Sequence, residues 1–380
     1  MRAKFEVSTF YSKSITQNHP MAEPLKNEFN EAFVTQLGDL LAERDESFNL
    51  DGFIRSTINE NWEARALKDR MRHISNMIHA HTSLNYLEQL SIVVDIAAQF
   101  GGLLGMTFPD YVEVYGLDYP KESIAALYQL TRYSSSEFAI RPYIIAYENE
   151  VMKAMLEWSK DENEHVRRLA SEGCRPRLPW AMALPTFKKD PTLLLPILEN
   201  LKEDESLYVR KSVSNNINDI TKDNPDIALK LSERWYGAND HTNWIVKNGL
   251  RNLLKTGNKQ ALQIIGFNDN AKFKVPTLKL STKKVGIGNS FNFEFQISNL
   301  ESKNALAKVG FVVSYQKANG TLSDKIFHVT EKEFASSDPS VFKKKLSFKD
   351  LTTRKHHPGL HKIGVLVNGK KLAEEEFELV

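Results

Sequence analysis

The hydrophobic period of the chain changes once, and this change divides the sequence into two parts that must fold differently. From about residue 22 to 265, apolar residues recur at spacings of three and four, which predicts a succession of helices that each bury one face. From about residue 272 the period becomes two, and Phe291, Phe293 and Phe295 alternate with polar residues. We place the boundary near Gly266 to Val275.

The C-terminal part reads as a series of short strands. Further alternating runs follow in KVGFVVSYQ, KIFHVT, FKKKLSF and HKIGVLV, and Asn368-Gly369 predicts a two-residue hairpin turn after the last of them. About six or seven strands separated by turn residues are typical of an immunoglobulin-like sandwich. We therefore expect an all-β immunoglobulin-like domain over residues 271–380.

The helical part contains an internal repeat. Asp161–Ala170 aligns with Asp204–Val213 and, more loosely, with Thr242–Leu250. Each segment places a valine before a basic or polar residue, and these valines are Val166, Val209 and Val246. A turn acid that caps a helix, followed by Val-Arg at this period, is typical of HEAT-type helix pairs, which stack into a superhelix. The predicted fold is mainly α, a HEAT-like α-superhelix followed by the β-sandwich.

Cations follow the repeat valines, and they allow two interpretations. The residues are Arg167 with Arg168, Arg210 with Lys211, and Lys247. On equivalent faces of successive repeats, they could present a row of positive charges to the phosphates of a nucleic acid. Alternatively, they pair with the turn acids of neighbouring repeats and only stabilise the array.

The charge is unevenly distributed. The whole chain has a formal net charge of +2, but residues 271–380 carry 19 Lys and Arg against 11 Asp and Glu, a net +8, which leaves −6 for the rest. A segregated positive field is expected of a protein that binds a polyanion, although lysines that keep sheet edges soluble would look similar.

Cysteine use and hydropathy indicate the compartment. One cysteine, Cys174, cannot form an internal disulfide, so a reducing environment is expected. No apolar run is long enough to span a bilayer, and residues 1–20 lack the apolar core of a secretion signal. We expect a cytoplasmic protein that has no membrane association.

The densest group of reactive side chains lies in Ser171–Trp180. One glycine and two prolines break the preceding repeat helix there, which is costly unless the side chains must be directed to a particular place. The segment contains Glu172, Arg175, Arg177 and Trp180. An irregular loop with a structural Arg–Glu pair is the alternative interpretation.

Two further acids flank this segment, Glu137 upstream, close to Arg141, and Asp219 downstream. Acids on consecutive helix pairs can face one cavity, and beside a tryptophan they suit a flat, cationic substrate whose developing positive charge they stabilise. The histidines near residue 360 lie in a basic segment without a zinc-binding pattern, and neither a Walker nor a Rossmann motif is present. We expect no metal and no cofactor.

Three segments carry a family resemblance: Met21–Asn27 (MAEPLKN), Ser136–Pro142 (SEFAIRP) and above all Arg168–Trp180 (RLASEGCRPRLPW). They resemble the AlkC branch of the HEAT-like DNA alkylation repair glycosylases, relatives of AlkD. The resemblance covers residues 21–265, and longer members of the branch also carry a C-terminal immunoglobulin-like domain. Residues 1–20 lie upstream of the usual start of the family, and we expect them to be an N-terminal extension, either a tail or the result of an alternative translation start.

The resemblance implies a monofunctional DNA glycosylase. It would excise cationic N3-alkylated bases, 3-methyladenine and 3-methylcytosine, from double-stranded DNA by hydrolysis of the N-glycosidic bond, without conventional base flipping and as a monomer. By position in the motifs, Glu137 and Glu172 match the active-site acids, Asp219 the acid on the following repeat, and Trp180 the lesion-facing aromatic. Contacts with phosphate or the lesion edge would come from Arg141, Arg168, Arg175 and Arg177.

A second class of function remains open from the residues alone. A HEAT-repeat scaffold could bind DNA or a protein without performing chemistry.

Overall fold

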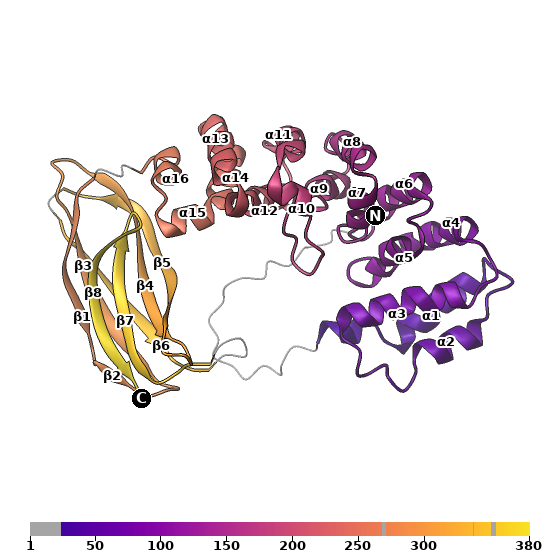
Figure 1. Cartoon of the computed structure of the whole chain (residues 1–380), viewed down its shortest axis with the longest axis horizontal. Helices are drawn as coiled ribbons and strands as arrows, with labels where there is room; N and C mark the ends of the chain where they lie inside the picture. The colour runs from indigo at the N-terminus through magenta and orange to yellow at the C-terminus, as the bar shows by residue number, and fades with distance from the viewer. Residues whose placement is uncertain (1–23, 268–270, 337, 351–354) are drawn as a thin grey trace, which may run out of the picture. The chain divides into compact units, whose positions relative to one another are not determined.

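The computed structural model describes residues 24–267, 271–336, 338–350 and 355–380 (Figure 1). The described residues form two compact units, one up to Asp118 and the other from Tyr119 onward. The predicted N-terminal extension, residues 1–20, lies outside the described residues. Within the described ranges, no helix is both long enough and apolar enough to cross a membrane.

The first unit is helical. Its aromatic core includes Phe33, whose ring meets that of Phe100 edge to face with centroids 5.4 Å apart. Buried Arg70 donates hydrogen bonds to the carbonyl oxygens of Lys26 and Phe29 at 3.2 and 3.1 Å. The elements are η1 (Leu25–Glu28), α1 (Glu31–Ala42), α2 (Leu50–Thr57), α3 (Leu67–Ala80), α4 (Tyr86–Ile96), η2 (Ala97–Gln99), η3 (Leu104–Met106) and α5 (Thr107–Tyr115).

The second unit begins with stacked helix pairs. Its helices are α6 (Pro120–Leu130), α7 (Ile140–Ala146), α8 (Glu148–Trp158), α9 (Glu164–Glu172), α10 (Pro185–Lys189), η4 (Thr192–Leu194), α11 (Leu195–Leu201), α12 (Leu207–Asp223), α13 (Pro225–Trp235), α14 (Asp240–Gly249), α15 (Arg251–Thr256) and α16 (Lys259–Ile264). Helix α12 packs against both α9 and α14, so the second helices of three successive pairs lie side by side (Figure 1). Val166, Val209 and Val246 on these helices are fully buried, as the repeat pattern predicts.

The repeat arginines stabilise the turns between helices. The Nη1 group of Arg167 donates to the carbonyl oxygens of Asp161 and Glu162, and that of Arg210 donates in the same way to Asp204 and Glu205, all at 2.7 to 2.9 Å. Arg167 also forms an ion pair with the Asp204 carboxylate of the next repeat, 2.6 Å between Nε and Oδ2. The interpretation as an internal ladder is therefore confirmed for Arg167.

The predicted capping role of the turn acids is wrong. Asp161 accepts a hydrogen bond from the backbone N–H of Asn163, and Asp204 accepts one from Ser206, so each acid closes the turn before its helix. The side chain of Asn163 caps α9 by accepting from the N–H of His165.

The unit ends in a β-sandwich, which confirms the predicted order of folds. Its strands are β1 (Phe273–Leu280), β2 (Lys284–Val285), β3 (Ser290–Asn299), β4 (Ala305–Gln316), β5 (Leu322–Phe334), β6 (Ser340–Ser347), β7 (Gly359–Val367) and β8 (Lys370–Leu379). One sheet has the order β1-β3-β6 and the other β2-β8-β7-β4-β5, and the pairs are antiparallel except for β2 with β8.

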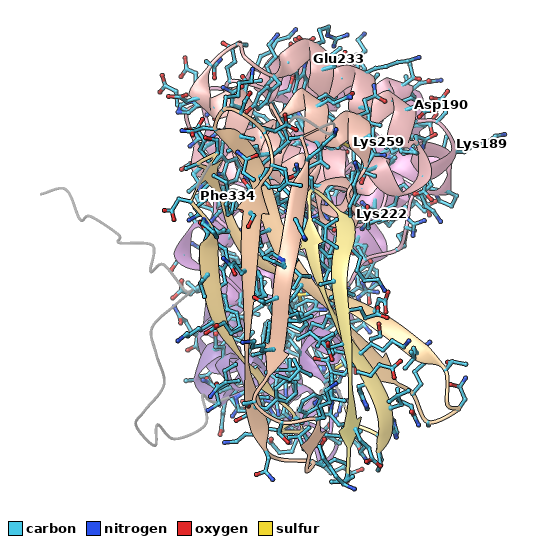
Figure 2. The ribbon with its side chains drawn as sticks, turned by 90° about the vertical axis from the view of Figure 1, so that its left-hand side faces the viewer. Lys189, Asp190, Lys222, Glu233, Lys259 and Phe334 are labelled. Carbon is cyan, nitrogen blue, oxygen red and sulfur yellow. The ribbon has the colours of Figure 1, made fainter. Side chains whose placement is uncertain are left out.

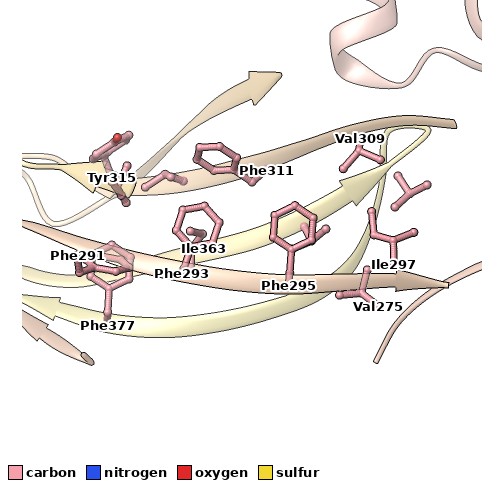
Figure 3. Packing of buried hydrophobic residues seen from close by; sticks show 14 of the residues in the cluster. Val275, Phe291, Phe293, Phe295, Ile297, Val309, Phe311, Tyr315, Ile363 and Phe377 are labelled. Carbon is pink, nitrogen blue, oxygen red and sulfur yellow. The ribbon is translucent and has the colours of Figure 1, made fainter. Parts of the chain in front are cut away.

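The sandwich core lies between the two sheets. The alternating residues of β3 point into it and meet Phe311 and Ile363 from the opposite sheet (Figure 3). The predicted hairpin is also present, because Asn368 and Gly369 join β7 to β8 with φ values of 49° and 75°, as a two-residue turn requires.

A core substitution should loosen the sandwich selectively. Phe295 is fully buried and packs against Phe342, with ring centroids 5.3 Å apart. Phe295→Ala removes this packing and leaves a cavity, which should cost about 3–5 kcal/mol. Hydrogen exchange measured by mass spectrometry should accelerate in β3 and its neighbouring strands while α1 to α5 keep their protection.

The matched control is Val341→Ala on β6, whose side chain is 55% exposed. It should leave exchange in the sandwich close to that of the wild type, and equal acceleration by both variants would contradict the assigned core.

Candidate functional site

Three elements of the second unit bring the predicted acids into one ion-pair network. Glu137 lies in the turn between α6 and α7, Glu172 is the last residue of α9, and Asp219 lies on α12. Arg168 forms ion pairs with both Glu137 and Glu172, and Arg175 with both Glu172 and Asp219. We call these five residues the acid–arginine cluster.

Glu172 is at the centre of the cluster. Its Oε1 lies 2.7 Å from Nη1 of Arg175 and 3.5 Å from Nη2 of Arg168. Burial, the largest influence, raises the pKa of Glu172, but the attraction of both guanidinium groups and a hydrogen bond with Ser212 outweigh it and hold the pKa below its usual value. The residue is therefore a carboxylate at neutral pH and can stabilise a nearby positive charge.

The three acids differ in accessibility. The side chain of Glu137 is 14% exposed, that of Glu172 7% and that of Asp219 1%. Asp219 accepts from Nε of Arg175 at 2.9 Å and from Lys222, labelled in Figure 2, at 3.1 Å. Its carboxylate thus orients cations in this structure, and a direct part in chemistry stays a prediction for it.

Trp180 lies on the loop that follows α9. Its side chain is 72% exposed, and its φ of 65° falls in the left-handed region that a bulky residue rarely adopts. Leu178 and Leu184 in the same segment are buried and anchor it. An exposed indole on an anchored loop is suited to contact with another molecule.

The structure places two of the predicted DNA-contacting arginines inside the protein. Arg141 is fully buried, and burial lowers its pKa to about 10. Its guanidinium donates to three backbone carbonyl oxygens of the loop after α9. Arg175 is buried as well and engages Glu172 and Asp219. These placements argue against phosphate contacts for both residues, because Arg141 is fully buried and the side chain of Arg175 is 8% exposed and already engaged by two acids.

The remaining predicted DNA-contacting residues differ in how far they are exposed and in whether groups of the same chain already bind them. Arg210 is half-buried, and its bonds to the turn carbonyls give it a structural role. Arg168 is held within the cluster, and Arg177 is exposed but forms two hydrogen bonds to Asp223 at 2.6 and 2.7 Å. Lys211 on α12 and Lys247 on α14 are exposed and stay candidates for phosphate contacts.

Several residues of the site carried no recognised signal in the sequence. Tyr208 lies under the guanidinium of Arg168, with Cζ 4.9 Å from the ring centroid. Ser135 donates to Glu137 at 2.9 Å and accepts from Arg168 at 2.7 Å. Arg251 donates to Asn215 at 3.0 Å; burial and then repulsion from Arg175 lower its pKa. Tyr208 precedes a repeat valine and Ser135 precedes the Ser136–Pro142 motif, so position beside these features could have indicated both.

The chemistry of other reactive groups is restricted. Burial raises the pKa of the Cys174 thiol to about 12, so a thiolate nucleophile is disfavoured. In the part of the chain that the structure describes, no group of three or more His, Cys, Asp and Glu side chains is placed to hold a metal ion.

Comparison with known proteins gives consistent matches. Residues 133–253 match the DNA alkylation repair enzyme family, and residues 274–380 match the C-terminal Ig-like domain of uncharacterised protein YhaZ. The chain is 41% identical over 355 residues to the uncharacterized protein YhaZ of Bacillus subtilis strain 168, which covers 93% of this chain and 99% of that protein. The structure of the Pseudomonas fluorescens alkylpurine DNA glycosylase AlkC, bound to DNA containing an abasic site analog, matches with a TM-score of 0.90 and 36% identity, covering 94% of this chain and 99% of that one.

The cluster should make stability depend on pH. Because the folded state lowers the pKa of Glu172, its stabilising contribution is present above the unfolded-state pKa and is lost as pH falls through the folded-state pKa. Near neutral pH, Glu172→Gln should reduce the free energy of unfolding by about 1.5–3 kcal/mol, since Arg168 and Arg175 each lose one charged partner and each keep a second acid. The difference from the wild type should shrink as the pH falls below about 4.3, the ordinary pKa of a glutamate, because the carboxylate of Glu172 is then protonated.

Urea unfolding across this pH range checks the expectation. Glu203→Gln, at an exposed position, is the control and should change stability little at any pH. A difference for Glu172→Gln that is constant with pH would show that the cluster does not depend on the charge of Glu172.

Proposed function

Because this chain belongs to the AlkC branch of the DNA alkylation repair enzymes, we propose that it is a monofunctional DNA glycosylase that excises cationic N3-alkylated bases, 3-methyladenine and 3-methylcytosine, from double-stranded DNA. The observation that carries this proposal is the acid–arginine cluster, whose central carboxylate is ionised and lies on the same segment as the exposed Trp180.

The proposed reaction needs little more than positioned negative charge. Methylation at N3 makes the base a cation, so it leaves with the electrons of the N-glycosidic bond and becomes neutral. Positive charge then develops on the sugar, and a water molecule adds to C1′ and gives its proton to a carboxylate. Glu172 would stabilise the developing charge, while Glu137, the most exposed of the three acids, is suited to accept the proton.

Recognition of the base would use its charge and its flat shape. An exposed indole attracts a cationic ring through its π face, so Trp180 could contact the lesion without a closed pocket for a flipped nucleotide. This mode agrees with the absence of conventional base flipping that the family resemblance implies.

Binding of the duplex would depend on residues outside the cluster. We assign catalysis to residues 21–265 and expect the sandwich of residues 271–380, with its net charge of +8, to add affinity for phosphate. Among the predicted DNA-contacting residues of the helical array, Lys211 and Lys247 are exposed and could contribute. The protein would act as a monomer in the cytoplasm.

A non-catalytic HEAT-repeat scaffold is the second candidate. It is favoured by one observation, namely that all three acids already form ion pairs with cations of the same chain. In that case the cluster would serve stability alone.

Base release separates the two functions. On DNA treated with a methylating agent, the wild type should release 3-methyladenine and 3-methylcytosine, and Glu172→Gln should reduce the rate about 100- to 1000-fold by removing a charge that stabilises the transition state. Chromatography of the released bases measures the rate, and a binding assay should show that affinity for undamaged DNA is retained.

Asp204→Asn is the matched control for this experiment. Asp204 is a buried acid with an arginine partner in the same helical array, but it lies outside the cluster. Its substitution should lower stability and leave the rate per folded molecule unchanged. If the wild type releases no base while DNA binding persists, the scaffold function is the correct one.

Salt dependence tests the phosphate contacts. If Lys211 and Lys247 each neutralise one phosphate, each substitution by alanine should reduce the slope of log affinity against log salt by about one. Lys153→Ala is the control. Lys153 is also exposed, but it lies on α8 and not in the row formed by α9, α12 and α14, so its substitution should leave the slope unchanged. Equal slopes for all variants would exclude both lysines from the interface.

A further inference from the structure

We infer that Arg141 is a positioning residue that holds Trp180 at a set distance from the acid–arginine cluster. The inference rests on the proposed function, because Trp180 matters there as the lesion-facing side chain. Arg141 contacts neither solvent nor any group expected to react, so it would act through the loop that it binds.

One guanidinium bonds to both sides of this loop. Nη1 of Arg141 donates to the carbonyl oxygens of Gly173 and Arg175 at 2.8 and 2.9 Å, and Nε donates to the carbonyl oxygen of Met182 at 2.8 Å. The first two acceptors lie on the segment that leaves α9, and the third lies on the returning segment. Arg141 therefore joins the two sides of the loop at their base.

The two sides carry the two halves of the proposed site. Gly173 directly follows Glu172, and the side chain of Arg175 bonds to Glu172 and Asp219. On the returning side, Met182 comes two residues after Trp180. A residue that fixes both sides also fixes the separation between the carboxylates and the indole.

The backbone of the loop needs such support. Backbone bonds within the loop include one from Leu184 N–H to the carbonyl oxygen of Pro176 at 3.1 Å and one from Ala181 N–H to that of Leu178 at 3.3 Å. Trp180 has a φ of 65° and a largely exposed side chain, so burial of the indole does not impose this conformation. Such a conformation persists only where the surroundings enforce it.

Arginine is suited to this role and lysine is not. The planar guanidinium offers donors in a rigid fork, whereas an ammonium group is a single centre on a flexible chain. Arg141 remains a cation at neutral pH despite its burial, with Glu137 and Asp219 among the charges that favour its ionised form. Arg141→Lys keeps the positive charge and removes the simultaneous bonds to both sides of the loop.

A double-mutant cycle tests whether Arg141 acts through Trp180. The value of kcat/KM for base release is measured for the wild type, Arg141→Lys, Trp180→Ala and the double variant. Arg141→Lys alone should lower kcat/KM about 10- to 100-fold, as expected for a misplaced contact, and should have little further effect once Trp180 is absent. Independent losses that multiply in the double variant would overturn the inference.

Arg70→Lys is the matched control. Arg70 is also buried and also donates to two backbone carbonyls, but it belongs to the first unit. It should lower stability and leave kcat/KM per folded molecule unchanged. If Arg141→Lys fails to fold, Arg141→Gln, which keeps a donor for one side of the loop, replaces it in the cycle.

Proteolysis gives a readout that needs no catalytic activity. Trypsin can cleave after Arg177, which is exposed, whereas Arg175 is protected by the following Pro176. Under native conditions, cleavage after Arg177 should be faster in Arg141→Lys than in the wild type or Arg70→Lys, because the loop opens more often.

The two readouts distinguish the possible failures. Unchanged cleavage would show that Arg141 does not hold the loop. If the wild type releases no base, the glycosylase proposal fails, and accelerated cleavage would still establish Arg141 as the residue that closes the loop.

Discussion

The second unit depends on the ionisation of buried acids. A carboxylate as enclosed as that of Glu172 would be protonated without compensation, since burial favours the neutral form. Arg168 and Arg175 supply the compensation. Each arginine also pairs with a second acid that belongs to a neighbouring helix pair, Arg168 with Glu137 and Arg175 with Asp219. The same ion pairs thus join α9 to the α6–α7 turn and to α12 and keep a negative charge available for chemistry.

Under the proposed function, this dual use would link stability with catalysis. The cluster exists only when three successive helix pairs are stacked, because its members come from three of them. In the free protein its carboxylates already face cations, so a cationic substrate would meet a site whose negative charge is ordered in advance. Arg141 extends this order to the loop that carries Trp180.

The arginines show where interpretation of the sequence succeeded and where it could not. The internal-ladder interpretation was correct for Arg167, whose partner Asp204 occupies an equivalent turn in the next repeat. Arg141 and Arg175 were expected at DNA, yet their donors are directed to groups inside the protein. A sequence shows that a residue is cationic, but not whether its side chain points into the core.

The sequence by itself determined the two-part fold, the repeat valines, the Asn368-Gly369 hairpin and the family, because periodicity, turn chemistry and a long motif are local features. Only the tertiary structure decided which acids share an arginine, how far each is covered, and that Arg141 closes the loop of Trp180. The physical reason is that these contacts join residues about 30 to 45 positions apart, and burial and pairing at that separation depend on how the helix pairs stack.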